Sequence, residues 1–84
     1  MIVDWHHYAR EDWQRLELVD AVSVARAVYA WAETFTGLVE ATEGGGVFRL
    51  YVGSAHVVRF LIDHTTDTMS VIQVLGPKAR PRRH

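Results

Sequence analysis

Three β-rich runs in the second half of the chain limit the fold most strongly. They are Val47 to Gly53, His56 to Asp63 and Met69 to Leu75, and Gly53-Ser54 and the segment from Asp63 to Thr68 separate them. β-branched and aromatic residues favour strands, whereas clusters of Gly, Asp and Thr favour turns. This order predicts an antiparallel meander of three strands.

The first half of the chain has helical periodicity. Ala9, Trp13 and Leu16 recur at a spacing that predicts a short helix from about Tyr8. A second helix is expected from about Asp20 to Phe35, because apolar residues again recur at helical spacing. Asp20 is the expected N-cap and Gly37 the expected C-terminal stop. We expect residues 38–46, which end in three glycines, to form a flexible approach to the sheet.

These elements predict an α+β domain. A short N-terminal strand at Ile2–Trp5 precedes a two-helix hairpin, which packs on a three- to four-stranded, mainly antiparallel sheet. Successive strand residues point to opposite faces, so Arg49 and Tyr51 should lie on the open face of the sheet. The last strand is apolar at nearly every position, which indicates a strand covered on both sides.

Composition limits the class of protein. With 84 residues, 49% of them hydrophobic, the chain is expected to form one domain over residues 1–76, followed by a basic tail at 77–84. Cysteine is absent, which excludes disulfides and thiolate metal sites and favours a reducing, cytoplasmic setting. No apolar run is long enough to span a membrane, and no export signal is recognisable.

Charge is distributed unevenly along the chain. Residues 1–46 hold three arginines and eight acidic residues, whereas residues 47–84 hold six basic and two acidic residues. This asymmetry indicates an anion-binding face on the sheet, with nucleic acid as the usual ligand. His7 and Glu11 are spaced for one helix face, but two ligands make a poor metal site, so we expect no metal and no cofactor.

The chain resembles the RelE/ParE superfamily of toxins from bacterial type II toxin-antitoxin pairs. The likeness covers nearly the whole length. Its most recognisable part is an aromatic-Arg-Leu-x-Val-Gly strand, here Phe48 to Gly53, followed by a strand that closes on Ile62-Asp63. The resemblance implies a toxin that cleaves messenger RNA on the ribosome. Alternatives are a non-enzymatic poison of DNA gyrase, or a catalytically weakened homologue that acts as a binding module.

The resemblance also implies site residues. Arg49 matches the first strand cation of the family, and Tyr51 replaces the second, where it could stack on an unpaired base. The next cationic position falls on His56 when it is counted forward from Gly53. Counted back from Ile62-Asp63 it falls on Val57, with Arg59 two residues later on the same face. Only one of His56 and Arg59 can face the cleft. The basic tail completes the expected site, with Lys78 and Arg80 in catalysis and Arg82, Arg83 and His84 in RNA binding.

Each of these residues also has a structural interpretation. Arg49 can be a solvated surface arginine, His56 a core residue, and the tail a flexible charged end. The partners implied by the resemblance are a cognate antitoxin, the ribosome and its messenger RNA, or DNA gyrase in the alternative. A dimer or a toxin-antitoxin hetero-oligomer is the expected assembly.

Overall fold

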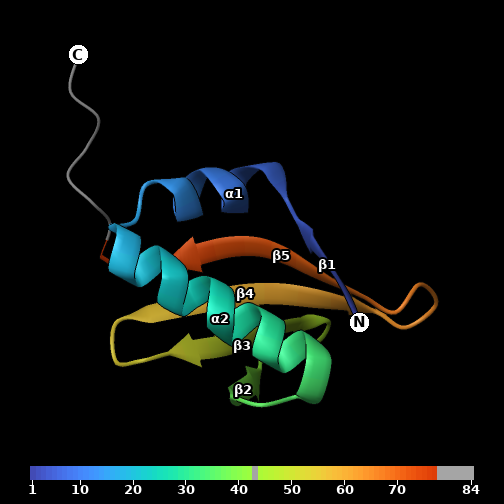
Figure 1. Cartoon of the computed structure of the whole chain (residues 1–84). Coiled ribbons are helices and arrows are strands. Elements are labelled where there is room, and N and C mark those ends of the chain that lie inside the picture. Colours follow the sequence, from blue (N-terminus) through green and yellow to red (C-terminus); the bar gives the residue numbers. More distant parts are fainter. Residues whose placement is uncertain (43, 78–84) are drawn as a thin grey trace.

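The computed structural model describes residues 1–42 and 44–77, which form two helices and one five-stranded sheet (Figure 1). The elements in chain order are β1 (Ile2–Trp5), α1 (His7–Gln14), α2 (Leu18–Thr34), β2 (Leu38–Ala41), β3 (Val47–Val52), β4 (His56–Asp63) and β5 (Thr68–Leu75). The predicted α+β class and the three-stranded meander are confirmed. No helix in the described part of the chain is long and apolar enough to cross a membrane.

The sheet has the order β1-β5-β4-β3-β2. β1 is parallel to β5, and every other neighbouring pair is antiparallel. The chain therefore starts at one edge of the sheet and, after both helices, continues from the opposite edge. β1 and β2 are therefore the two edge strands, and the two helices connect them.

The expected flexible approach at residues 38–46 is wrong for its first part, because Leu38–Ala41 form the edge strand β2. This strand pairs antiparallel with β3, and Thr42 continues the pairing: its backbone N–H and its hydroxyl both donate to the carbonyl of Val47. Gly44, Gly45 and Gly46 all have positive φ angles. The glycines therefore serve a β-hairpin turn, for which such angles are suited.

The ends of α2 differ from the prediction. Glu17 is the N-cap and its side chain makes no capping hydrogen bond, whereas Asp20 lies within the first turn. There its carboxylate complements the positive end of the helix dipole. At the other end Phe35, not Gly37, adopts the left-handed conformation with φ 56°. The Phe35 ring meets Trp31 edge-on at 5.0 Å between centroids, which helps this larger residue hold a position usually given to glycine.

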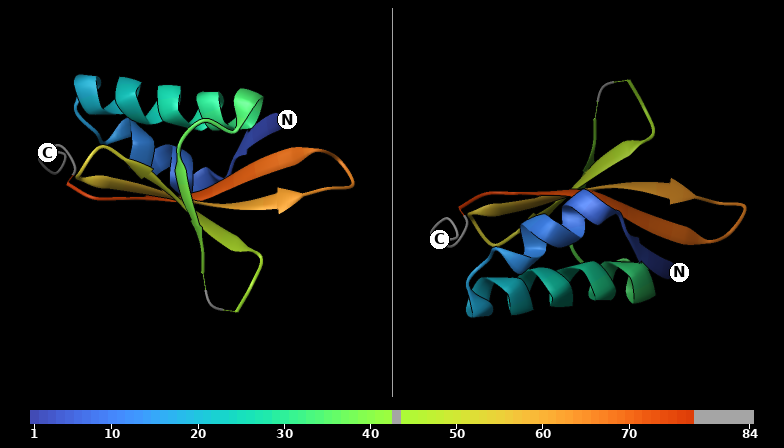
Figure 2. Two further views of the ribbon diagram at one scale, coloured as in Figure 1. Left: turned by 90° about the horizontal axis from the view of Figure 1, so that it is seen from below. Right: turned by 90° about the horizontal axis from the view of Figure 1, so that it is seen from above.

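The core lies between α2 and one face of the sheet. Phe60 of β4 is fully buried, and its ring packs 4.8 Å from that of Trp31 and 5.5 Å from that of Phe48, measured between centroids. Both helices lie on the same side of the sheet (Figure 2). The other face is therefore free of helices in the described part of the chain, as the hairpin prediction required.

α1 protects the edge of β5 where β1 ends. β1 pairs with β5 only from Thr68 to Val71. Beyond that point, the N–H of Val74 donates to the Asp12 carboxylate of α1 at 3.5 Å. This side of the sheet is thus shielded from pairing with another strand, a common device at sheet edges. The core covers one face of β5, and the prediction that its other face is covered as well stays a prediction.

Candidate functional site

Four polar side chains form a row across the open face of the sheet. The strand registers place Glu40 of β2 opposite Arg49 of β3, Arg49 opposite Arg59 of β4, and Arg59 opposite Gln73 of β5. Residues directly opposite each other in antiparallel strands point to the same face, with Cβ atoms about 5 Å apart. A groove of about 700 Å³ lies over this row and is lined by Glu40, Ala41, Thr42, Arg49, Arg59 and Leu75.

The two arginines of the row have different partners. Arg49 Nη1 donates to Glu40 Oε1 at 3.3 Å, which makes an ion pair. Arg59 Nη1 donates instead to the neutral amide oxygen of Gln73 at 2.7 Å. Among the residues that the structure describes, Arg59 has no acidic partner. The groove therefore retains a positive charge that is available to an anion.

Tyr51 extends the site into the next row of side chains. It lies two residues after Arg49 on β3 and hence on the same face. Its hydroxyl donates to Glu40 Oε1 at 2.8 Å, the same oxygen that accepts from Arg49. A carboxylate, a phenol and a guanidinium are thus joined at one end of the groove, where acid-base chemistry and anion binding can act together.

Glu40 is the functional candidate that sequence reasoning missed. Its strand was expected to be a flexible segment, so its carboxylate had no predicted neighbours. A signal was present: Leu38 to Ala41, the glycine run and Val47 to Val52 have the order strand, turn, strand that is typical of a hairpin. Pairing these two strands across the turn would have brought the carboxylate close to Arg49.

The register of β4 separates His56 from Arg59. Arg59 faces the groove, whereas His56 lies opposite Val52 on the helix-covered side and is only 6% exposed. His56 Nε2 lies 2.8 Å from the carbonyl oxygen of Pro77. The structure therefore brings Arg49, Tyr51 and Arg59 together and leaves His56 outside the groove. The catalytic roles given to these residues stay predictions.

No protein family model matches the sequence, and no curated protein matches it. Solved structures do match. A YoeB/ParE toxin from Agrobacterium tumefaciens is similar with a TM-score of 0.75 and 20% identity, over 92% of this chain and 99% of that one. The toxin-antitoxin complex RelBE2 from Mycobacterium tuberculosis contains a chain with a TM-score of 0.73 and 19% identity, over 90% and 96% of the two chains.

An archaeal RelE-RelB complex from Pyrococcus horikoshii gives a TM-score of 0.71 and 16% identity, over 98% of this chain and 97% of that one. These matches span almost the full length of both partners in each comparison. This chain has the RelE/ParE toxin fold. Because the identities are low, the likeness establishes the arrangement of helices and strands, and the chemistry of the groove must be argued from its own residues.

Residues 78–84 of the predicted basic tail lie outside the described residues. The predicted roles of its residues therefore stay predictions; they concern Lys78, Arg80, Arg82, Arg83 and His84. Pro77, the last described residue, is held at its carbonyl by His56. Leu75, two residues earlier, lines the groove. Leu75, at the end of β5, is therefore the last described residue that lines the groove.

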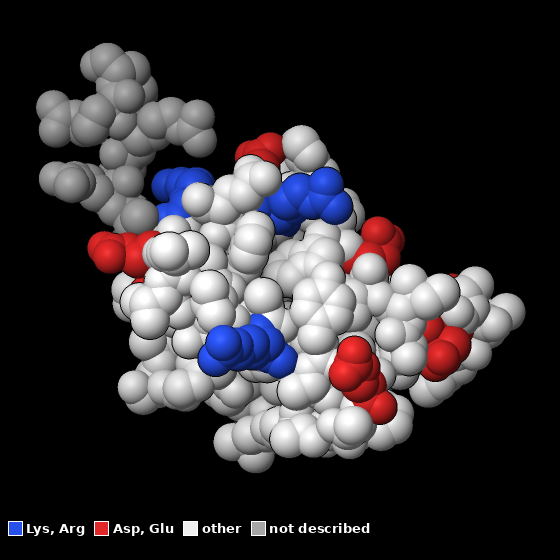
Figure 3. Space-filling view, in the orientation of Figure 1, with Lys and Arg blue, Asp and Glu red and all other residues white. Residues whose placement is uncertain are grey.

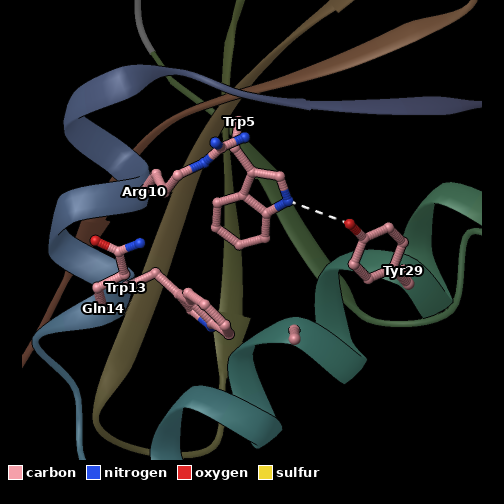
Figure 4. A pocket seen from close by; sticks show the side chains of 6 residues that line it. Trp5, Arg10, Trp13, Gln14 and Tyr29 are labelled. Carbon is pink, nitrogen blue, oxygen red and sulfur yellow. Dashed lines mark hydrogen bonds between the residues drawn. The ribbon is translucent and has the colours of Figure 1, made fainter.

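A second hollow lies in the helical layer, away from the open face of the sheet. It has a volume of about 250 Å³ between β1, α1 and α2, where Trp5 Nε1 donates to the Tyr29 hydroxyl at 3.3 Å (Figure 4). Its lining residues are Trp5, Arg10, Trp13, Gln14, Ala25 and Tyr29. Since this lining includes neither a carboxylate nor a histidine, it offers less acid-base chemistry than the groove.

The helical side also lacks the charge pattern of an anion site. Figure 3 shows basic and acidic side chains interspersed over the side that carries α2. His7 Nε2 lies 2.7 Å from Glu11 Oε2 on α1, but the described residues include no group of three or more side chains that could hold a metal ion. The open sheet face is therefore the best candidate for nucleic-acid contact.

Proposed function

We propose that this protein is the toxin of a toxin-antitoxin pair and that it cleaves RNA in the groove on its open sheet face. The observation that carries the proposal is the direct pairing of Arg49 with Arg59, with a carboxylate within hydrogen-bond distance of one of them. Like charges directly opposite each other destabilise a sheet, so folding alone does not favour this arrangement. A bound phosphate removes the repulsion.

The two arginines suit a phosphodiester. Guanidinium groups present several N–H donors in a plane and bind phosphate oxygens in pairs. Placed on neighbouring strands, Arg49 and Arg59 can contact the two non-bridging oxygens of one phosphate or two successive phosphates. Tyr51 lies beside them with its ring available for stacking on a base of single-stranded RNA.

The same residues can carry out strand cleavage. Glu40 takes the proton of the ribose 2′-hydroxyl, and the 2′-oxygen forms a bond to phosphorus while the bond from phosphorus to the 5′-oxygen breaks. The arginines stabilise the extra negative charge on the phosphorane oxygens. Tyr51 gives its hydroxyl proton to the departing 5′-oxygen. Once the product has left, Glu40 again lies 2.8 Å from the Tyr51 oxygen and passes its proton to it, so both groups are restored.

The products of this reaction are a 2′,3′-cyclic phosphate and a 5′-hydroxyl end. By the resemblance to RelE-type toxins, the proposed substrate is messenger RNA on the ribosome, and the proposed place of action is the cytoplasm. The similar chain from M. tuberculosis occurs in a toxin-antitoxin complex, and that from P. horikoshii occurs in a RelE-RelB complex. We extend this partnership to the present chain and propose a cognate antitoxin that covers the groove.

Two experiments test the function. Expression of the chain alone in bacteria should arrest growth, and pulse labelling should show methionine incorporation falling before thymidine incorporation. Purified protein added to ribosomes translating a defined message should produce new 5′ ends that primer extension detects. If labelling of DNA falls first and an SOS response appears while translation continues, the ribonuclease proposal is wrong.

That outcome would favour the second candidate, a non-enzymatic poison of DNA gyrase. One observation supports it: Glu40 neutralises Arg49 in an ion pair, which lowers the positive charge of the groove. Tyr51 likewise stands where the resemblance leads us to expect a second cation. A protein of this kind would keep its antitoxin and its fold but leave RNA intact in the primer-extension assay.

A further inference from the structure

We propose that Glu40 holds the place of a phosphate on Arg49, so that RNA must displace this carboxylate before the groove is occupied. The inference rests on the proposed function and adds a substrate-dependent step to it. In the free protein Glu40 Oε1 accepts from both Arg49 Nη1 and the Tyr51 hydroxyl, at 3.3 and 2.8 Å. One carboxylate oxygen thus engages both the guanidinium that would bind the phosphate and the hydroxyl that would act as the acid.

The ion pair between Glu40 and Arg49 is suited to being broken. Charge-assisted N–H···O bonds are typically about 2.7–2.9 Å long, so a bond of 3.3 Å is a weak one. Both side chains are about half exposed, 46% for Arg49 and 57% for Glu40. Exposed pairs of this kind contribute little to stability. A phosphodiester offers two non-bridging oxygens to the planar guanidinium and can replace the carboxylate.

The position of Glu40 also favours movement. β2 has only four residues, lies at the edge of the sheet and pairs with β3 alone. It follows Gly37 and precedes the run Gly44 to Gly46, so residues that permit wide backbone rotation lie on either side. Short edge strands with few partners are among the segments that open most easily. Arg59, held by the neutral Gln73, stays in place as the first contact for the incoming phosphate.

Displacement would couple binding to chemistry. In the free protein the Oε1 atom of Glu40 already accepts from Arg49 and Tyr51, so it is not free to accept the proton of a ribose hydroxyl. Phosphate binding to Arg49 releases the carboxylate beside the ribose of the same nucleotide. The free protein therefore holds its base in a less reactive state, and the substrate activates it.

A non-cleavable RNA separates binding from catalysis. We would measure the affinity of a fully 2′-O-methylated oligoribonucleotide by fluorescence anisotropy for the full chain and its variants. Glu40→Gln should bind about two- to five-fold more tightly than the unmodified protein, the size expected for removal of an exposed ion pair. Glu33→Gln, which removes the same charge from an exposed site at the end of α2, should change the affinity less.

A double-mutant cycle then assigns the gain to Arg49. In an Arg49→Gln background the added Glu40→Gln change should give no gain beyond that of Glu33→Gln, because no guanidinium remains for the carboxylate and the phosphate to compete for. If Glu40→Gln and Glu33→Gln behave alike while the unmodified protein binds and cleaves RNA, the displacement step is wrong and the proposed function stands. If neither the unmodified protein nor any variant binds the oligonucleotide, both are wrong.

Discussion

Arg49 and Arg59 are direct cross-strand neighbours on the open face of the sheet, yet one is paired with a carboxylate and the other with an amide. Arg49 and Glu40 therefore neutralise each other at one end of the row, whereas Arg59 keeps its positive charge at the other. Among the described residues Arg59 has no carboxylate partner to compete with an anion in the groove. The arrangement thus gives the two arginines separate tasks, which the following experiments can distinguish.

Replacing Arg49 with Gln should abolish growth arrest while leaving the fold intact. Arg49 is half exposed, and changes at such surface positions usually alter the free energy of unfolding by less than about 0.5 kcal/mol. Thermal unfolding and a growth assay check the two effects. Arg26→Gln, an exposed arginine of α2, is the matched control and should keep toxicity. A melting temperature that falls together with toxicity would make Arg49 a structural residue.

Replacing Tyr51 with Phe tests the proposed acid. The ring remains available for stacking, but the hydroxyl that donates to Glu40 is removed. We expect RNA affinity to stay nearly unchanged and the cleavage rate to fall by about 10²-fold or more, the usual contribution of a general acid. Tyr8→Phe, at an exposed position on α1, serves as the control. Full cleavage by the Tyr51 variant would remove the phenol from the mechanism.

His56→Ala should lower stability, whereas Arg59→Ala should weaken RNA binding. His56 is buried and its ring lies within hydrogen-bond distance of the Pro77 carbonyl, so its removal should lower stability by about 1–3 kcal/mol. Arg59→Ala should reduce RNA binding and leave the melting temperature close to that of the unmodified protein. Chemical denaturation and anisotropy on both variants give the comparison. Equally weakened binding with full stability in both variants would contradict the register of β4.

A glycine pair tests the end of β5. Gly76 and Gly45 both have positive φ angles, but an added Cβ at Gly76 would lie 2.4 Å from the Ala55 carbonyl oxygen, whereas at Gly45 it meets nothing within 4 Å. Gly76→Ala should therefore destabilise the protein by about 1–3 kcal/mol more than Gly45→Ala, since the clash involves backbone. Similar denaturation midpoints for the two variants would show that the backbone at Gly76 relaxes freely.

Removal of residues 78–84 tests the predicted role of the tail. The fold should persist, because the helices and strands of the described residues all end by Leu75. If tail cations bind phosphates, the slope of log affinity against log salt should fall by about 0.7–0.9 for each phosphate that the shortened protein no longer neutralises. Anisotropy titrations at several salt concentrations supply this slope. An unchanged slope would leave nucleic-acid binding to the groove alone.

Local pattern alone was enough to predict several parts of this protein. The meander, the strand at Ile2–Trp5 and the outward direction of Arg49 and Tyr51 follow from alternation, which is a property of neighbouring residues in one strand. The second helix was predicted by its periodicity, including its end near Phe35, although the residues expected to cap it, Asp20 and Gly37, were wrong. The residue that ends the helix is Phe35, whose ring contacts Trp31 one turn earlier, and hydrophobic periodicity alone does not indicate which residue takes the left-handed conformation.

The composition of the groove was decided only by tertiary structure. Whether β2 exists, and whether Arg59 or His56 faces Arg49, depends on which strands pair and in which register. A shift of one residue exchanges the two faces of a strand, and the sequence of that strand does not by itself choose between them. The choice comes from burying Phe60 and Val58 beneath α2, because this packing turns Arg59 toward the open face and Glu40, on β2, completes the row.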